Sequence, residues 1–279
     1  MIRILAFLGF LLIAYFVLAG FLYIFQRSFI YFPNTQIVDP QDLLVDDIYQ
    51  VVNVETEDGL FLKGWYHAPS RPDMPVIVWF HGNGGHYAAQ AHLMEAYVDA
   101  GYGTLLAGYR GYSGNPGKPS ESGIYSDANA WLNYLINNLD YSEQHIVLYG
   151  ESLGSGVAVE MATRYDVGAV ILQAPFSSVS DIASWKFPIM PIRFLLHDTY
   201  DSISKVEKVS EPLLLIHGTK DKVIPIRYGK KLFARAQQDR TFYEVMEAGH
   251  NDLHLYGIDK KVLSFLERVY LQEKSGALQ

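Results

Sequence analysis

The chain contains no cysteine among its 279 residues. This absence excludes disulfide bonds, thiolate metal sites and cysteine nucleophiles, but it does not identify the compartment. The chain also lacks a basic tract, and its net charge of −8 argues against a general role in nucleic-acid binding. Charged residues make up only 19% of the chain and hydrophobic residues 49%, so the chain can bury a sizeable core and wholesale disorder is excluded.

The N-terminal segment lacks polar residues over an unusually long stretch. From Ile4 to Phe25 there is no charged residue, no Asn, no Gln and no Pro. As an α-helix rising ~1.5 Å per residue, this run is about 33 Å long, enough to cross a hydrocarbon core of about 30 Å. Arg3 and Arg27 flank it. We therefore expect residues 1–27 to form a single-pass transmembrane anchor that stays uncleaved.

Two other interpretations of this run are open. A cleaved signal peptide would end near Ala19, but the apolar run continues to Phe25 and exceeds the ~7–15 residues usual for a signal sequence. A core helix lying at the protein surface would show a polar stripe, and this run shows none. Counting Arg3 and the α-amino group against Arg27 slightly favours a cytoplasmic N-terminus, which places the larger domain on the non-cytoplasmic side.

The rest of the chain, residues 28–279, changes to a rhythm of short strands and helices. Two strand-like runs at 49–56 and 60–66 are joined by Glu57-Asp58-Gly59, and Asp-Gly between such runs is a hairpin signal. From residue 76 onward, apolar runs typical of buried strands alternate with runs of helical periodicity. We expect an α/β fold with a mostly parallel central sheet and helices on both faces. The expected strands are 76–80, 104–107, 146–149, 169–172, 213–216 and 241–246, and the expected helices are 88–100, 124–139, 154–164, 225–237 and 262–271.

The sequence Gly-Glu-Ser-Leu-Gly at 150–154 directly follows one expected strand and precedes an expected helix. In this context Gly-x-Ser-x-Gly predicts a sharp strand-to-helix turn that lifts the serine above the sheet edge. The helix N-terminus adds partial positive charge where an oxyanion would form. We therefore predict that Ser152 is a nucleophile, although the bare pentapeptide also occurs by chance in turns.

A serine hydroxyl is a poor nucleophile without a base and a group that orients the base. His250 and Asp221 each follow an expected strand closely, so both should lie at the sheet edge that carries Ser152. The sequence therefore predicts a catalytic triad of Ser152, His250 and Asp221. Asp181, in the loop after another strand, is the rival acid.

Glycines also follow the expected strand 76–80, in the sequence His-Gly-Asn-Gly-Gly at 81–85. Glycines allow backbone N–H groups to face a substrate, and we assign the two oxyanion-hole donors to the N–H groups of Asn83 and Leu153. The alternative is a phosphate cradle, but the Lys-Ser/Thr ending of a P-loop is missing. No metal is expected, because His250 and His254 lack the partner motif of a helical metal pair.

These motifs together resemble those of the membrane-anchored α/β-hydrolase-domain serine hydrolases. The matching blocks are 81–84, 109–114, 150–154, 217–221 and 249–250, and residues 25–33 are similar to the region after the anchor in that family. The resemblance covers nearly the whole chain and implies the α/β-hydrolase fold, the triad and hydrolase activity. Some members of the family cleave fatty acyl thioesters from proteins, and the resemblance does not choose among substrates.

The regular alternation breaks at 176–211, a segment too long for a plain loop in a compact domain. The segment is unusually apolar, and we expect an inserted cap. Trp185 and Phe187 are expected to face the cleft above Ser152 and to bind an acyl chain. The alternative is that these side chains pack on the core or dip into a membrane surface.

We therefore expect a membrane-anchored serine hydrolase that cleaves acyl esters or thioesters through an acyl-enzyme. Its substrates would be small acyl compounds, lipids or acylated proteins, and it would need no cofactor. Three alternatives stay open: a peptidase or amidase with the same triad, an acyltransferase in which an alcohol resolves the acyl-enzyme, and a non-catalytic binding protein on the same fold.

Overall fold

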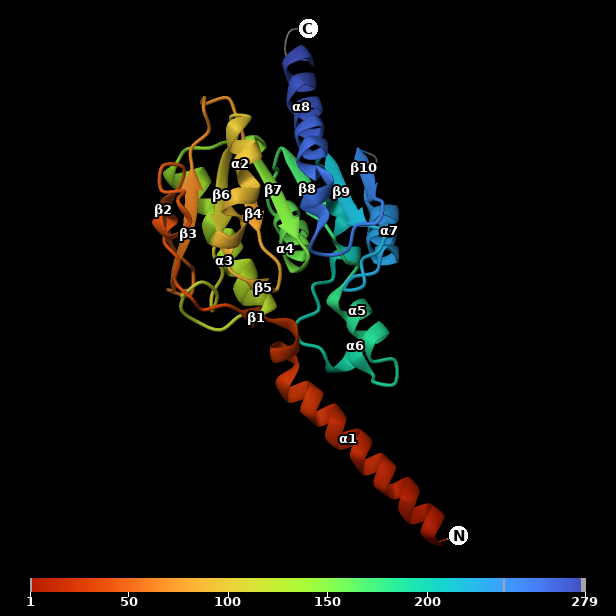
Figure 1. Cartoon of the computed structure of the whole chain (residues 1–279). Helices are drawn as coiled ribbons and strands as arrows, with labels where there is room; N and C mark the ends of the chain where they lie inside the picture. Colours follow the sequence, from red (N-terminus) through yellow and green to blue (C-terminus); the bar gives the residue numbers. More distant parts are fainter. Residues whose placement is uncertain (1, 238, 277–279) are drawn as a thin grey trace.

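An eight-stranded sheet forms the centre of the chain (Figure 1). The computed structural model describes residues 2–237 and 239–276. The strand order is β10-β9-β8-β7-β4-β6-β3-β2; β3 pairs antiparallel with β2 and with β6, and the five other neighbouring pairs are parallel, which confirms a mostly parallel sheet. The strands are β2 Gln50–Glu55, β3 Phe61–His67, β4 Val76–Phe80, β6 Gly103–Ala107, β7 Ile146–Glu151, β8 Ala169–Gln173, β9 Leu213–Gly218 and β10 Arg240–Val245.

Helices cover both faces of the sheet, because its central strands are apolar on both sides. All residues of β4 and of β8 are buried. Side chains of α2 and α8 pack into the core on one face, and side chains of α3, α4 and α7 into the core on the other, which confirms the expected layers. These helices are α2 Ala91–Asp99, α3 Glu121–Asn133, α4 Leu153–Ala162, α7 Ile226–Arg235 and α8 Ile258–Gly276.

The helix expected at 124–139 differs from the observed one at both ends. α3 begins at Glu121 because the side chain of Ser120 accepts a hydrogen bond from the N–H of Gly123 at 3.1 Å. It ends at Asn133, and a single π-helical turn, Tyr134–Asn138, continues the helix. The apolar pattern predicts a helix over this segment, but it does not specify a single π turn, which is a local departure from the α-helix.

Between β8 and β9 the chain leaves the sheet edge and forms a small helical excursion. α5 Val179–Lys186 and α6 Ile192–Leu195 stand beyond the sheet on the side of the N-terminal helix (Figure 1). Two short 3-10 turns, Ser202–Ser204 and Val206–Lys208, bring the chain back to β9. We call residues 176–211 the cap.

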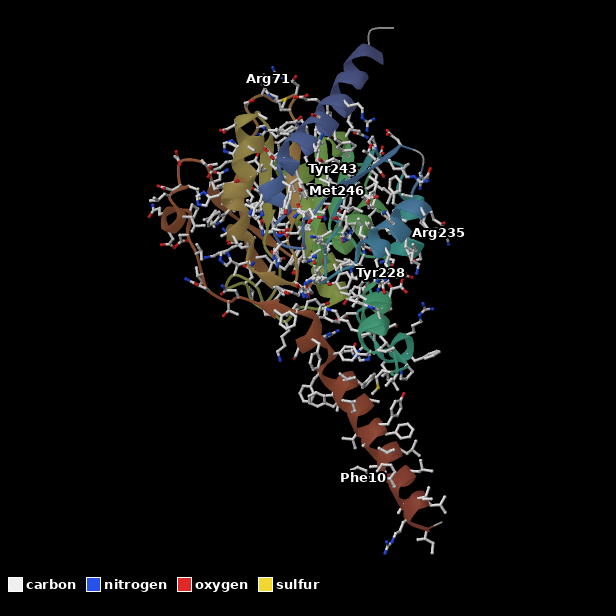
Figure 2. All side chains as sticks on the ribbon, turned by 45° about the vertical axis from the view of Figure 1, so that its right-hand side comes forward. Phe10, Arg71, Tyr228, Arg235, Tyr243 and Met246 are labelled. Carbon is white, nitrogen blue, oxygen red and sulfur yellow. The ribbon has the colours of Figure 1, made fainter. Side chains whose placement is uncertain are left out.

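The N-terminal helix α1 runs from Ile2 to Ile30, past the end of the apolar run at Phe25. Among the helices of the described residues, it is the one long and apolar enough to cross a membrane. Most of its side chains, such as Phe10, point away from the rest of the protein (Figure 2). A short strand, β1 Phe32–Pro33, follows it and pairs in parallel with β5 Gly84–Gly85, in the glycine-rich loop after β4.

Candidate active site

Ser152 occupies a strained turn between β7 and α4. Its backbone has φ 50° and ψ −115°, a conformation that residues with a side chain rarely adopt. The flanking glycines permit this turn: a Cβ on Gly150 would lie 2.3 Å from the carbonyl oxygen of Gly154, and a Cβ on Gly154 would lie 1.9 Å from that of Phe80. Strand and helix therefore approach as closely as the Gly-x-Ser-x-Gly motif predicts.

The structure brings together the three residues of the predicted triad. His250 Nδ1 lies 2.7 Å from Asp221 Oδ2, and His250 Nε2 lies 3.0 Å from Ser152 Oγ. A carboxylate can only accept a hydrogen bond, so we assign the imidazole proton to Nδ1, which leaves Nε2 to accept the proton of the serine hydroxyl. This is the arrangement in which a histidine can act as a general base toward serine.

Asp221 is held in place by more than its contact with His250. Its Oδ1 accepts hydrogen bonds from the N–H groups of Val223 and Ile224, both at 2.8 Å. His217 Nε2 lies 3.3 Å from Asp221 Oδ2. Burial alone would raise the pKa of Asp221, but the hydrogen bonds from His217, His250 and the backbone outweigh it and lower the pKa below its usual range. The carboxyl group is therefore ionised and fixed in one orientation.

The rival acid, Asp181, stands elsewhere with partners of its own. It lies in the first turn of α5, where it accepts hydrogen bonds from Lys231 Nζ at 2.6 Å and from Ser177 Oγ at 2.5 Å. Arg193 is also within 3.3 Å. These contacts fix α5 to α7, and the geometry therefore favours Asp221 as the partner of His250.

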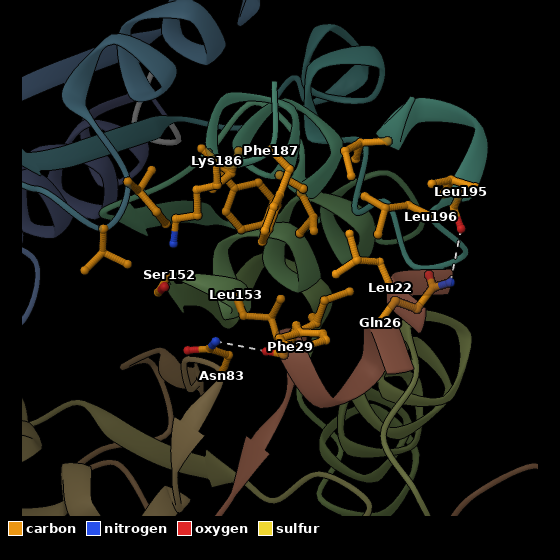
Figure 3. Close-up of a pocket in the computed structure, with 18 residues that line it drawn as sticks. Leu22, Gln26, Phe29, Asn83, Ser152, Leu153, Lys186, Phe187, Leu195 and Leu196 are labelled. Carbon is orange, nitrogen blue, oxygen red and sulfur yellow. Dashed lines mark hydrogen bonds between the residues drawn. The ribbon is translucent and has the colours of Figure 1, made fainter. Parts of the chain in front are cut away.

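Both residues assigned to the oxyanion hole lie beside Ser152 (Figure 3). Leu153 begins α4, so its N–H is one of the first-turn N–H groups that have no partner within the helix. Asn83 is held in place by residues of α1 and β1. Its side-chain Nδ2 donates to the carbonyl oxygen of Ile30 at 2.9 Å, and its own carbonyl accepts from the N–H of Phe32 at 2.9 Å.

Comparisons with known proteins agree with this geometry. A family model described as "Serine aminopeptidase, S33" matches residues 72–199. The chain is 36% identical over 249 residues to an uncharacterised protein of Mycobacterium tuberculosis strain H37Rv, which covers 89% of this chain and 88% of that protein. It is 32% identical over 229 residues to alpha/beta hydrolase domain-containing protein 17C of Xenopus laevis, which covers 80% of this chain and 69% of that protein. The chain belongs to the α/β-hydrolase family.

Solved structures support the same fold. The esterase Pf2001 of Pyrococcus furiosus aligns with a TM-score of 0.69 over 85% of this chain and 98% of its own, at 19% sequence identity. At that identity the likeness concerns the fold alone. As a member of the α/β-hydrolase family, the protein is a hydrolase.

An apolar cavity opens beside Ser152 in this hydrolase. Its volume is about 180 Å³, whereas a single buried water needs only about 15 Å³, so the cavity has space for part of a substrate. Three parts of the chain enclose it: the active-site loops, the cap and the end of α1 (Figure 3). The apolar lining residues are Leu22, Phe29, Ile30, Leu153, Phe176, Val179, Ile182, Ala183, Phe187, Ile192, Leu195, Leu196, Val223 and Ile224.

The two cap residues expected to bind substrate differ in their placement. Phe187 lines the cavity, but Trp185 does not. The guanidinium of Arg227 lies 4.9 Å from the centre of the Trp185 ring, and the ring of Tyr228 lies 6.4 Å away. Trp185 lies in the last turn of α5 and Phe187 is its C-cap residue, so a count of apolar residues could not separate them. Contrary to the expectation, the structure therefore does not place Trp185 at the cavity beside Ser152.

Sequence reasoning also missed residues that line the cavity. Lys186 contributes the one positive charge among the described lining residues, and Figure 3 shows its ammonium group turned toward Ser152. Gln26 of α1 lines the cavity too. The sequence offered one signal for Gln26, which is the first polar side chain after the apolar run. A helix that only crossed a membrane would place residues that face the lipid headgroups at this position.

Two polar residues near the site have structural roles. The N–H and Nε of Arg110 bond the fully buried carboxylate of Asp127 at 2.8 Å each, and its other nitrogens bond Asp58, so Arg110 anchors its glycine-rich loop. His81 Nδ1 donates to the carbonyl oxygen of Gly82 at 2.8 Å. Burial lowers the pKa of His81 to about 4, so this histidine stays neutral.

Proposed function

We propose that this hydrolase is a membrane-anchored serine hydrolase that cleaves acyl esters or thioesters. The observation that carries the proposal is the continuous hydrogen-bonded chain Asp221–His250–Ser152, which ends at an apolar cavity. Ser152 is the proposed nucleophile, His250 the general base, and Asp221 the residue that orients the base.

The reaction follows from these positions. Ser152 Oγ attacks the acyl carbon while His250 Nε2 takes the hydroxyl proton, and Asp221 stabilises the resulting imidazolium. The N–H groups of Leu153 and Asn83 stabilise the negative charge on the carbonyl oxygen. The tetrahedral intermediate then expels the alcohol or thiol, which receives the proton from His250. Water, deprotonated by His250, attacks the acyl-enzyme and releases the acid.

The cavity chemistry favours an acyl substrate over the peptidase alternative. An aminopeptidase must hold a positively charged α-amino group, which calls for a carboxylate near the nucleophile. None of the described residues that line the cavity carries a carboxylate, and the charge that is present belongs to Lys186. An apolar acyl chain fits this lining better, because each buried methylene contributes roughly 0.8 kcal/mol.

We propose that α1 is an uncleaved membrane anchor. A signal peptide cut near Ala19 would lose Tyr15, yet the Tyr15 hydroxyl donates to the carbonyl oxygen of Ile189 in the cap at 3.1 Å, and Ala19 itself is buried. Both contacts are expected of a helix that stays attached. Charge counting favours a domain on the non-cytoplasmic side.

Active-site labelling of the full chain in detergent tests the proposal. A fluorophosphonate probe should label the wild-type protein, and Ser152→Ala should abolish both labelling and turnover of p-nitrophenyl butyrate. The matched control is Ser126→Ala, in α3 and outside the cavity lining, which should keep both. Turnover retained in Ser152→Ala would reject the mechanism, and a wild-type protein that binds the ester without cleaving it would favour the non-catalytic alternative.

A further inference from the structure

The membrane helix forms one wall of the cavity beside Ser152. Leu22, Gln26, Phe29 and Ile30 of α1 all line it, opposite the cap (Figure 3). A wall supplied by a membrane anchor is unexpected, because an anchor needs only to hold a domain near the bilayer. The position of α1 therefore bears on which substrate the cavity admits.

One narrow stripe of α1 faces the cap. Tyr15 and Leu22 are partly buried, and Ala19, Gln26 and Ile30 are buried. These five residues are spaced by three or four positions, so they lie along one side of the helix. The neighbouring residues of the apolar run are mostly exposed. One side of α1 therefore contacts the cap, and the wider, exposed side would face lipid.

Polar contacts fix the cap against this stripe. Gln26 Nε2 donates to the carbonyl oxygen of Leu195 at 3.1 Å, and Gln26 Oε1 accepts from the N–H of His197 at 2.7 Å. Arg27 Nε bonds Asp198 Oδ2 at 2.9 Å. Since the Gln26 side chain is buried and satisfied at both ends, the wall has a defined position relative to the cap.

Two large apolar side chains at the tip of the cap are exposed beside the same helix. Ile189 is 80% exposed and Phe194 is 89% exposed. The Ile189 carbonyl accepts its hydrogen bond from Tyr15, which lies roughly 15 Å along the helix axis before Phe25 at ~1.5 Å per residue. If α1 crosses a bilayer, the cap tip therefore lies within the apolar layer, where exposed Ile and Phe side chains are favourable.

We propose that the cavity takes the acyl chain of a membrane-lipid ester, which enters from the bilayer between α1 and the cap. Leu22 and Phe29 on one side and Phe187 and Leu195 on the other would enclose the chain. The ester carbon then meets Ser152, the lipid alcohol leaves with the proton from His250, and water releases the fatty acid. This inference rests on the proposed hydrolase function and adds the anchor as a determinant of chain length.

The first experiment changes the wall without touching the catalytic residues. We compare kcat/KM for p-nitrophenyl acetate and decanoate with the full chain in detergent, for Leu22→Trp and for the control Ile24→Trp, whose native side chain is 72% exposed on the lipid side. Leu22→Trp should lower the ratio of kcat/KM for decanoate to kcat/KM for acetate at least tenfold, because the larger indole ring would occupy part of the cavity. Ile24→Trp should leave both rates within twofold of wild type. An unchanged ratio in Leu22→Trp would overturn the inference.

The second experiment tests entry from the bilayer. The full chain is reconstituted in phosphatidylcholine vesicles that contain 4-methylumbelliferyl palmitate, and its activity is compared with that of protein in separate vesicles mixed with the ester-containing ones. Hydrolysis should be at least tenfold faster when enzyme and ester share a bilayer. Equal rates would reject entry from the bilayer, whereas a wild-type protein that cleaves no ester and takes no fluorophosphonate would reject the proposed function itself.

Discussion

Replacing Asp221 with Asn tests the proposed triad most directly, because the structure dictates how the amide must sit. Asp221 Oδ1 accepts two backbone hydrogen bonds, from Val223 and Ile224. An amide at this position keeps its oxygen toward these donors, since the reverse orientation would leave two N–H groups facing an NH₂ group. Each unpaired donor costs about 1–3 kcal/mol, so the correct orientation is favoured by about 2–6 kcal/mol.

The NH₂ group of the new side chain then points at His250 Nδ1, where Asp221 Oδ2 now accepts at 2.7 Å. His250 can accept this hydrogen bond only with its proton on Nε2, which faces Ser152 Oγ. In that tautomer Nε2 cannot take the serine proton. The expected loss in kcat is about 10³–10⁴-fold, which corresponds to about 4–5.5 kcal/mol of transition-state stabilisation.

The assay is the hydrolysis of p-nitrophenyl butyrate by the full chain in detergent, with thermal unfolding as a check of the fold. Asp181→Asn is the matched control, because Asp181 is also a paired carboxylate but does not contact His250. It should keep kcat within about threefold of wild type. The reasoning is refuted if Asp221→Asn keeps more than a tenth of the activity, or if Asp181→Asn loses more than Asp221→Asn does.

Three further predictions concern stability and the contact between α1 and the cap. Gly154→Ala should destabilise the protein by about 3 kcal/mol or more, measured by urea unfolding, because the new Cβ would lie 1.9 Å from the Phe80 carbonyl oxygen; a change below about 1 kcal/mol would contradict the close approach. The pKa of His81 is about 4 in the folded chain and about 6.5 when unfolded, so the unfolded state binds more protons between these values. The free energy of unfolding should therefore fall as the pH drops from 6.5 to 4, and His81→Phe, which keeps an aromatic ring against Tyr109, should flatten this slope; an identical slope in the variant would count against it. Gln26→Leu should leave the carbonyl of Leu195 and the N–H of His197 without their partner, and it should increase protease cleavage in the cap, detected by mass spectrometry; cleavage equal to wild type would mean that Gln26 does not hold the cap.

The sequence was sufficient to predict the parts of the site that are positioned by the ends of strands. Ser152, Asp221 and His250 each follow a short apolar run at once or within a few residues, and the carboxyl ends of neighbouring parallel strands lie at one sheet edge. Once the runs are recognised as strands, the topology brings the three residues to that edge without any detail of side-chain packing. The same logic placed Asn83 and Leu153, because both lie in the first residues after a strand.

The sequence was not sufficient for the parts of the site that depend on which apolar surfaces pack against each other. Trp185 and Phe187 are separated by one residue and have the same chemical character, yet one packs on Arg227 and the other lines the cavity. Likewise, the run before Gln26 is apolar on every side, so its pattern gives no sign of the stripe that faces the cap. Such choices depend on the shape of the assembled surfaces, which hydrophobic patterning alone does not encode.

The unbroken passage of α1 into the domain also sets how far the active site can reach. The N–H of Tyr31 still bonds the carbonyl of Arg27, and β1 joins the active-site loop directly afterwards. A flexible tether would let a domain search a volume that grows with tether length, whereas the helical rise from Phe25 to Ile30 is only about 8 Å. If α1 crosses a bilayer as proposed, Ser152 therefore works at one fixed height above the apolar layer. An ester or thioester carried well above the membrane, on the outer part of another protein, lies beyond its reach unless that protein bends down to it.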